Sequence, residues 1–327
     1  MSDLEELMQP VSADAVAGPD LAYDPKRQEI EAAFEAARLA DRGEGEAPDW
    51  SAIIGLIKDQ AKLTKDATLA VYLARAGARA QRLADVALGC AFLAGMFETW
   101  WDQIHPSLQE YGFQGRKGAC ESLASIGDFL GPLRRVVFVS HPRLGEFTAE
   151  QIEAFATQGD SAENVGMFRA AVAEIDKAEI EASLSAIEEI RGAITRVDTV
   201  LTAKAEGDTA TNFAATYEAL DSIRNSVVAA TGVGAPAPAV ADSGQGDSAQ
   251  APQAAGMKAS IESRADVIRA IEAIVDYYSR HEPGSPIPLV LDRAKAWVNM
   301  DFLSILNDIN PSGAEDAKRV LTRTATE

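Results

Sequence analysis

The sequence predicts an all-α protein with at most a short strand pair. Apolar residues recur at helical spacing over most of the chain up to residue 230. The next stretch, residues 231–256, has no aromatic residue and no Lys or Arg, and a short apolar region follows it. We therefore expect a multi-helix N-terminal domain (1–160), a helical hairpin (161–230), a flexible linker (231–257) and a small helical C-terminal domain (258–327).

Two long helices are expected early in the N-terminal domain. The first begins at Trp50, where Asp49 precedes an apolar helical pattern and is a suitable N-cap. The second begins near Leu83, and the dipeptide His105–Pro106 is expected to end it.

A strand and a hairpin complete the part of the chain before the linker. Residues 135–140, "RVVFVS", have the composition of a strand, and Thr148 with Gln151 predicts a capping box for the helix that follows. Residues 164–230 predict two antiparallel helices with facing apolar seams, at Ile180, Leu184, Ile187, Ile190, Ile194, Val197 and Leu201, and at Phe213, Tyr217, Leu220, Ile223 and Val227. We interpret this hairpin as internal to the chain, with an intersubunit coiled coil as the alternative.

The sequence of the C-terminal domain predicts three short helices joined by sharp turns. Prolines after residue 281 prevent the first helix from continuing, a second helix begins near Pro288, and Asp301 is a suitable cap for a third. Trp297 and Phe302 are expected in the core of so small a domain. The positions that we expect to shape this domain or its oligomer are Tyr278, His281, Pro283, Pro286, Pro288, Trp297, Asn299, Met300, Asp301 and Phe302.

Charge and composition exclude some classes of function. The formal net charge of −20 argues against nucleic-acid binding, which draws its affinity from Lys and Arg. The N-terminus has neither the basic nor the apolar region of a secretion signal, and we find no apolar run of the roughly 18 residues that span a bilayer. The two cysteines lie in apolar helical contexts. We expect a cytoplasmic protein without membrane insertion.

Catalytic motifs are missing from the sequence. It has no phosphate-binding glycine loop, no nucleophile elbow and no zincin pair. Asp102 and His105 are the one local pair with metal-like spacing, and His141 and His281 both lie next to prolines or close to them. Histidines in such positions are more often structural, so we expect no enzyme activity, no catalytic residue, no cofactor and no metal.

Both ends of the chain carry a family resemblance. The C-terminal "YYSRHEPGSPIPLVLDRAKAWVNMDFLSIL" resembles the C-terminal region of TssA-type (ImpA-related) components of bacterial type VI secretion systems. The segments "GPDLAYDP", "PDW", "LTKDATLAVYLARA" and "WWDQIHP" resemble, in this order, the ImpA-type N-terminal domain. The N-terminal motif residues are Gly18, Pro19, Asp20, Tyr23, Asp24, Pro25, Trp50, Trp100, Trp101, Asp102, His105 and Pro106.

The resemblance implies a non-enzymatic, cytoplasmic assembly component of a contractile injection machine. It implies a high-order ring formed through the C-terminal domain, and contacts with baseplate, tube or sheath and membrane-complex proteins. The tail resembles that of the baseplate-associated kind, whereas long forms with other C-terminal domains cap the growing sheath. Two alternatives remain, a generic helical adaptor without a secretion role and an enzyme that uses Asp102, His105 or His281.

Overall fold

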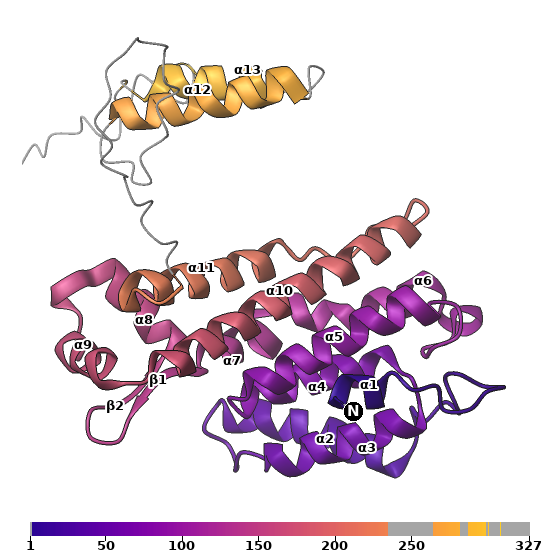
Figure 1. Ribbon diagram of the computed structural model, residues 1–327. Helices are drawn as coiled ribbons and strands as arrows, with labels where there is room; N and C mark the ends of the chain where they lie inside the picture. The colour runs from indigo at the N-terminus through magenta and orange to yellow at the C-terminus, as the bar shows by residue number, and fades with distance from the viewer. Residues whose placement is uncertain (1, 235–263, 282–286, 299, 301–307, 309–327) are drawn as a thin grey trace, which may run out of the picture. The chain divides into compact units, whose positions relative to one another are not determined.

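The structure is a computed structural model that describes residues 2–234, 264–281, 287–298, 300 and 308. The chain forms two compact units, Met1–Ala239 and Val240–Glu327. The described part is helical apart from one pair of short strands (Figure 1), so the predicted fold class is confirmed. Most of the predicted linker, from residue 235 to residue 257, lies outside the described residues.

The first unit begins with five helices, of which α2, α3 and α4 have aspartate N-caps. They are α1 (Asp3–Leu7), α2 (Pro25–Ala40), α3 (Trp50–Leu63), α4 (Ala67–Arg79) and α5 (Leu83–Trp100). Asp24, Asp49 and Asp66 accept hydrogen bonds from the first free backbone N–H groups of α2, α3 and α4. The cap at Asp49 was predicted from the sequence and is confirmed.

Helix α5 lies at the centre of the first unit, packed against α4 on one side and a later helix, α10, on another. It is 18 residues long and apolar enough to cross a membrane by length and composition, with 61% of it buried inside the protein. The expectation that no apolar run reaches this length was therefore wrong. The apolar composition of α5 fits a helix enclosed by other helices.

The middle of the first unit contains short, irregular elements. Helix α6 (Leu108–Glu121) is followed by a 3₁₀ turn (Ser122–Ala124), a π-helical turn (Ile126–Leu130) and α7 (Gly131–Arg134). Strands β1 (Val137–His141) and β2 (Gly145–Thr148) pair antiparallel, which confirms the predicted strand. The capping box of Thr148 and Gln151 is also confirmed, at the start of α8 (Ala149–Gln158); a 3₁₀ turn (Gly159–Ser161) and α9 (Val165–Glu174) follow.

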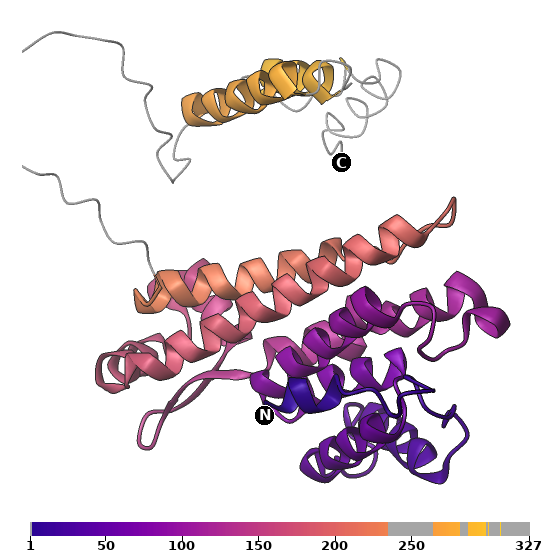
Figure 2. The same ribbon diagram turned by 45° about the vertical axis from the view of Figure 1, so that its right-hand side comes forward.

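The predicted hairpin consists of α10 (Lys177–Lys204) and α11 (Ala214–Thr231), which run side by side in both ribbon views (Figures 1 and 2). The α10 seam and most of the α11 seam are buried as expected, and Arg191 pairs with Asp221 across the two helices at 2.7 Å. Helix α10 also packs along α5, while α11 packs on α8. An ion pair of 2.6 Å between Arg196 and Glu98 joins α10 to α5. The hairpin is therefore intramolecular and part of the first unit's packing.

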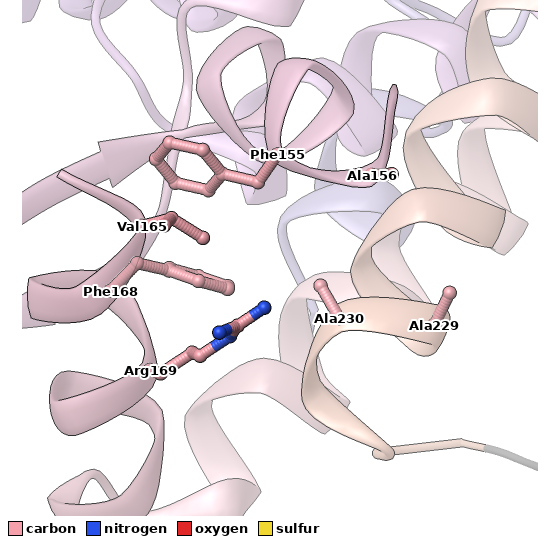
Figure 3. A pocket seen from close by; sticks show the side chains of 7 residues that line it. All are labelled: Phe155, Ala156, Val165, Phe168, Arg169, Ala229 and Ala230. Carbon is pink, nitrogen blue, oxygen red and sulfur yellow. The ribbon is translucent and has the colours of Figure 1, made fainter. Parts of the chain in front are cut away.

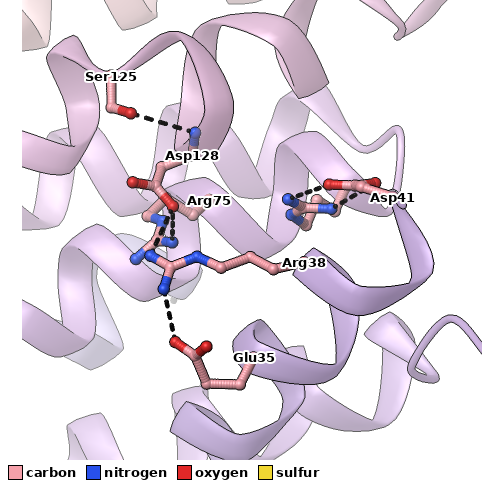
Figure 4. Close-up of polar contacts among 7 residues, drawn as sticks. Glu35, Arg38, Asp41, Arg75, Ser125 and Asp128 are labelled. Atoms are coloured by element: carbon pink, nitrogen blue, oxygen red, sulfur yellow. Dashed lines mark hydrogen bonds and ion pairs between the residues drawn. The ribbon is translucent and has the colours of Figure 1, made fainter. Parts of the chain in front are cut away.

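A cluster of charged residues ties α2 and α4 to the π-helical turn (Figure 4). The carboxylate of Asp128 accepts hydrogen bonds from Arg75 at 2.8 Å and from Arg38 at 3.1 Å. Arg38 in turn pairs with Glu35 at 2.6 Å, and the backbone N–H of Asp128 donates to Ser125. Because every charge in this cluster has a partner of opposite sign, its role is to hold these elements together.

The described part of the second unit consists of α12 (Arg264–His281), α13 (Ile287–Trp297) and a few residues beyond them. The two helices pack against each other, with an ion pair of 3.5 Å between Lys295 and Glu272. The start of the second helix near Pro288 agrees with the sequence prediction. The predicted third helix from Asp301 lies outside the described residues, except for Asp308.

Candidate interaction site

The N-terminal motif folds into a loop that is held against the junction between α3 and α4. Gly18 has a φ of +68°, and a Cβ at this position would lie 2.5 Å from the carbonyl oxygen of Leu63. Both the backbone conformation and the lack of space therefore exclude a side chain at this position. The carbonyl of Ala17 accepts a hydrogen bond from the backbone N–H of Lys65 at 2.8 Å.

The segment after α5 pairs with the same junction. The backbone N–H of His105 donates to the carbonyl of Lys65 at 2.8 Å, and that of Ala67 donates to the carbonyl of His105 at 2.9 Å. Nε2 of His105 reaches the carbonyl of Gly18 at 3.1 Å. Two motif segments, 87 residues apart in the sequence at Gly18 and His105, are thus joined through one histidine.

Helix α5 ends at Trp100, earlier than the predicted end at His105. The physical reason is Arg116, a fully buried residue whose guanidinium donates hydrogen bonds to the carbonyls of Trp101 and Ile104. These carbonyls lie beyond the end of the helix, and the Arg116 side chain donates to them in place of backbone N–H groups. Desolvation lowers the pKa of Arg116 to about 10, so the guanidinium is charged at neutral pH.

Further buried charges lie under the motif loop. Arg27 pairs with Asp66 at 2.9 Å, and both side chains are 5% exposed. Lys65 is 1% exposed, and its ammonium donates to the carbonyl of Ala61 at 2.8 Å. Desolvation lowers the pKa of Lys65 to about 8. Sequence reasoning missed Arg27, Lys65 and Arg116, because a single charge on a helix is normally solvated and nothing local marks it as buried.

Some motif residues stay on the surface. Asp20, Pro19 and Pro25 are exposed, and Tyr23 is 85% exposed, the highest value among the large apolar or aromatic side chains of the described residues. Tyr111, which the sequence reasoning did not select, is also 49% exposed. The motif thus has a buried part that fixes the fold and an exposed part that is free to contact another molecule.

The three motif tryptophans do not gather at one place. Trp50 packs on Phe34, with ring centroids 5.2 Å apart, and Trp101 packs edge-on against Phe97 at 5.0 Å. Trp100 is partly buried in a shallow groove beside α10. Asp24 is the N-cap of α2 and accepts a hydrogen bond from Gln60 at 2.8 Å. These residues support the fold.

The groups with catalytic or metal-binding chemistry are dispersed. Asp102 is exposed, and no hydrogen bond or ion pair joins it to His105 in the described structure; nor do the described residues contain a group of three or more His, Cys, Asp or Glu suited to a metal. His141 pairs with Glu174 at 3.1 Å at the end of β1. Cys90 and Cys120 are free and buried, and burial raises the pKa of the Cys90 thiol to about 12. Both thiols are therefore protonated at neutral pH.

A pocket of about 340 Å³ lies between α8, α9 and the end of α11 (Figure 3). Phe155 and Phe168 form its aromatic wall, and Ala229 and Ala230 face them from α11. Arg169 points into the space between these walls and forms an ion pair of 2.6 Å with Asp160. The pocket has room for an apolar side chain, and its lining includes no nucleophile or general base.

The C-terminal candidate positions are described only in part. Pro283, Pro286, Asn299, Asp301 and Phe302 lie outside the described residues, and Tyr278 and His281 are described only as members of α12.

The remaining three positions lie in or next to α13. Pro288 is in the first turn of this helix, and Met300 is 42% exposed. Trp297 is partly buried rather than enclosed, and its indole N–H donates to Asp308 at 2.8 Å. Arg293 also donates to this carboxylate, at 3.0 Å. Trp297 therefore combines apolar contact with a polar tether to Asp308.

Comparisons with known proteins agree with the motif and the fold. Residues 8–125 match the family "ImpA, N-terminal, type VI secretion system". The type VI secretion system component TssA1 of Pseudomonas aeruginosa is 25% identical over 337 residues, which cover 96% of each chain. A solved structure of the N-terminal domain of the TssA component from Burkholderia cenocepacia has the same fold, with a TM-score of 0.58 and 21% identity over 71% of this chain and 94% of that one. The chain therefore resembles TssA-type, ImpA-related components of bacterial type VI secretion systems, and residues 8–125 match their N-terminal domain.

Proposed function

We propose that this chain is a non-enzymatic, cytoplasmic assembly component of a type VI secretion machine. In this proposal it associates with the baseplate, forms a high-order ring through its C-terminal domain and contacts baseplate, tube or sheath and membrane-complex proteins. The observation that carries the proposal is the match to TssA1 over 96% of both chains. The dispersal of chemically reactive groups in the described residues supports a scaffold role.

An exposed apolar surface on α13 supports the assignment of the ring contact to the C-terminal unit. Leu289 is 76% exposed and Val290 is 65% exposed, at the beginning of the helix. Two neighbouring aliphatic side chains that project into solvent are costly in an isolated molecule and are typical of a surface that another chain covers. A symmetric oligomer would cover this surface in every subunit at once.

The mass of the full-length protein in solution tests the proposal. We expect a large, closed oligomer by mass photometry, and we expect Leu289→Glu to dissociate it, because the change places a charge in an apolar contact. Ile126→Glu is the matched control, since Ile126 is 74% exposed in the first unit. A monomeric or dimeric wild-type protein would favour the generic adaptor instead. An oligomer that responds to both changes alike would contradict the C-terminal assignment.

Contacts with the machine require a second experiment. We expect the full-length protein to capture baseplate components of its own secretion system from a lysate, and deletion of the gene for this chain to abolish secretion while the other components are still made. A protein that captures none of these components, and whose loss leaves secretion intact, would lack the proposed role.

A further inference from the structure

The exposed part of the motif belongs to a small surface, which we call the tyrosine face and define as Asp20, Tyr23, Glu110 and Tyr111. Asp20 lies 3.9 Å from Nδ1 of His105, and its Oδ1 accepts a hydrogen bond from the backbone N–H of Ala22 at 2.9 Å. The start of this face therefore lies beside His105, which hydrogen bonds to Lys65, Ala67 and Gly18 hold in place.

Tyr111 approaches from α6. A Cβ added to Gly115 would lie 2.6 Å from the Cβ of Tyr111 and 3.5 Å from the Cβ of Pro106, so Tyr111 lies close to Pro106, the neighbour of His105. The absence of a side chain at Gly115 allows this close approach. The pKa of Tyr111 is raised. Tyr23 has the largest effect, followed by Glu110, and desolvation and Asp20 contribute less. Of the four side chains, Asp20 and Glu110 bring negative charge near Tyr111.

Neither tyrosine ring is needed for the core. With 85% and 49% of their surfaces exposed, Tyr23 and Tyr111 gain little from burial, and exposed aromatic side chains are typical of contact surfaces. An aliphatic partner would leave the carboxylates of Asp20 and Glu110 without a counter-charge, and an acidic partner would be repelled by them. A planar cation satisfies both the ring faces and the carboxylates.

We propose that the tyrosine face binds an arginine side chain presented by a partner protein, with the guanidinium against the tyrosine rings and paired with Asp20 or Glu110. Arginine fits better than lysine because its flat guanidinium stacks on a ring and bonds a carboxylate in two places. The net charge of −20 on the chain would also steer a basic partner segment toward it. The biological meaning of this contact rests on the proposed assembly function, whereas the binding chemistry does not.

Fluorescence anisotropy of a labelled hexa-arginine peptide, with the full-length protein at 150 mM NaCl, tests the proposal. We expect Tyr23→Ala with Tyr111→Ala to weaken binding at least fivefold without any change in net charge. The matched control is Leu39→Ala with Ile126→Ala, which truncates two exposed side chains elsewhere (46% and 74% exposed) and is expected to leave binding unchanged. Circular dichroism checks that each variant is folded.

A second pair of variants separates the site from general electrostatic attraction. Asp20→Asn with Glu110→Gln and Glu44→Gln with Glu46→Gln each remove two negative charges from exposed positions. We expect the first pair to weaken hexa-arginine binding several-fold more than the second. Equal losses would overturn the proposal, as would unchanged binding after removal of both tyrosines.

A hexalysine peptide tests the choice of arginine. We expect it to bind several-fold more weakly than hexa-arginine, and equal affinity would overturn the assignment to a guanidinium. This assay is independent of the secretion machine. Absence of peptide binding would refute the site and leave the proposed function standing, whereas a small oligomer that captures no secretion component would refute the function and leave the site standing.

Discussion

Buried polar contacts lie under the motif loop, and the ion pair between Arg27 and Asp66 is the clearest case. Asp66 also caps α4. We expect Asp66→Asn to lower the free energy of unfolding by about 3 kcal/mol, because the amide keeps the cap but leaves Arg27 buried without its full counter-charge. Asp49→Asn is the control, since Asp49 caps α3 at an exposed position and asparagine caps equally well. Urea denaturation measures both, and similar values would show that the buried pair contributes little.

Lys65 predicts a pH dependence of stability. Its pKa is lowered to about 8 from the ordinary 10.5 by desolvation. Below pH 8 the amine is charged in both states and the folded state bears the cost of burying it. Between about pH 8 and 10.5 the folded state releases a proton that the unfolded state keeps, so this contribution to stability rises with pH. We expect Lys65→Met to be more stable than wild type near pH 7, with an advantage that shrinks toward pH 10.

The control for this experiment is Lys62→Met. Lys62 is half exposed and pairs with Glu6 at 3.0 Å, and its pKa is raised by this partner. Its contribution is therefore constant between pH 7 and pH 10, and the difference between Lys62→Met and wild type should be flat in urea denaturation over this range. A flat difference for Lys65→Met as well would mean that its ammonium is solvated in the folded protein.

At the scale of elements, the contact between α4 and α5 depends on glycine. A Cβ at Gly89 would lie 2.5 Å from the backbone nitrogen of Ala74 and 2.8 Å from the carbonyl oxygen of Ala70. We expect Gly89→Ala to destabilise the protein by at least about 2 kcal/mol, because the helices must move apart. Gly192→Ala, in α10, meets no atom within 4 Å and should stabilise it by about 0.5–1 kcal/mol. Thermal melts with shifts of the same sign would contradict this account.

The elements that the sequence predicted correctly are those with local signals. Asp49 and the pair Thr148 and Gln151 mark helix starts within a few residues, and the spacing of the hairpin seams marks buried faces directly. The end of α5 was misplaced because it depends on Arg116, 16 residues beyond Trp100, and no local pattern announces that contact. The tyrosine face could not be predicted for the same reason, since Tyr111 belongs to α6 and no local sequence pattern connects it with Tyr23.

At the scale of the whole molecule, α10 packs on α5 and α11 packs on α8, so the hairpin is part of the first unit's core. The sequence expectation treated the hairpin as a separate domain because its seams are self-sufficient as a pair. A helix of 28 residues has more than one face, however, and Arg196 and its pair with Glu98 lie on a side that faces α5. The first unit therefore includes α11, and the linker to the second unit can begin only after this helix.

Limited proteolysis tests the assignment of residues 231–256 to the linker. Residues 231–256 are rich in Ala, Gly and Pro and contain no Lys or Arg, so elastase, which cleaves after small residues, has sites there and trypsin has none. We expect the first elastase cut to fall within 231–256, because a segment of this composition buries too little apolar surface to offset the entropy of ordering it. Intact mass spectrometry of the two fragments locates the cut. The exposed stretch at residues 41–47 is the internal competitor, since it offers Gly43, Gly45 and Ala47 to elastase and Arg42 to trypsin. A first elastase cut at 41–47, with 231–256 left intact, would contradict the linker assignment.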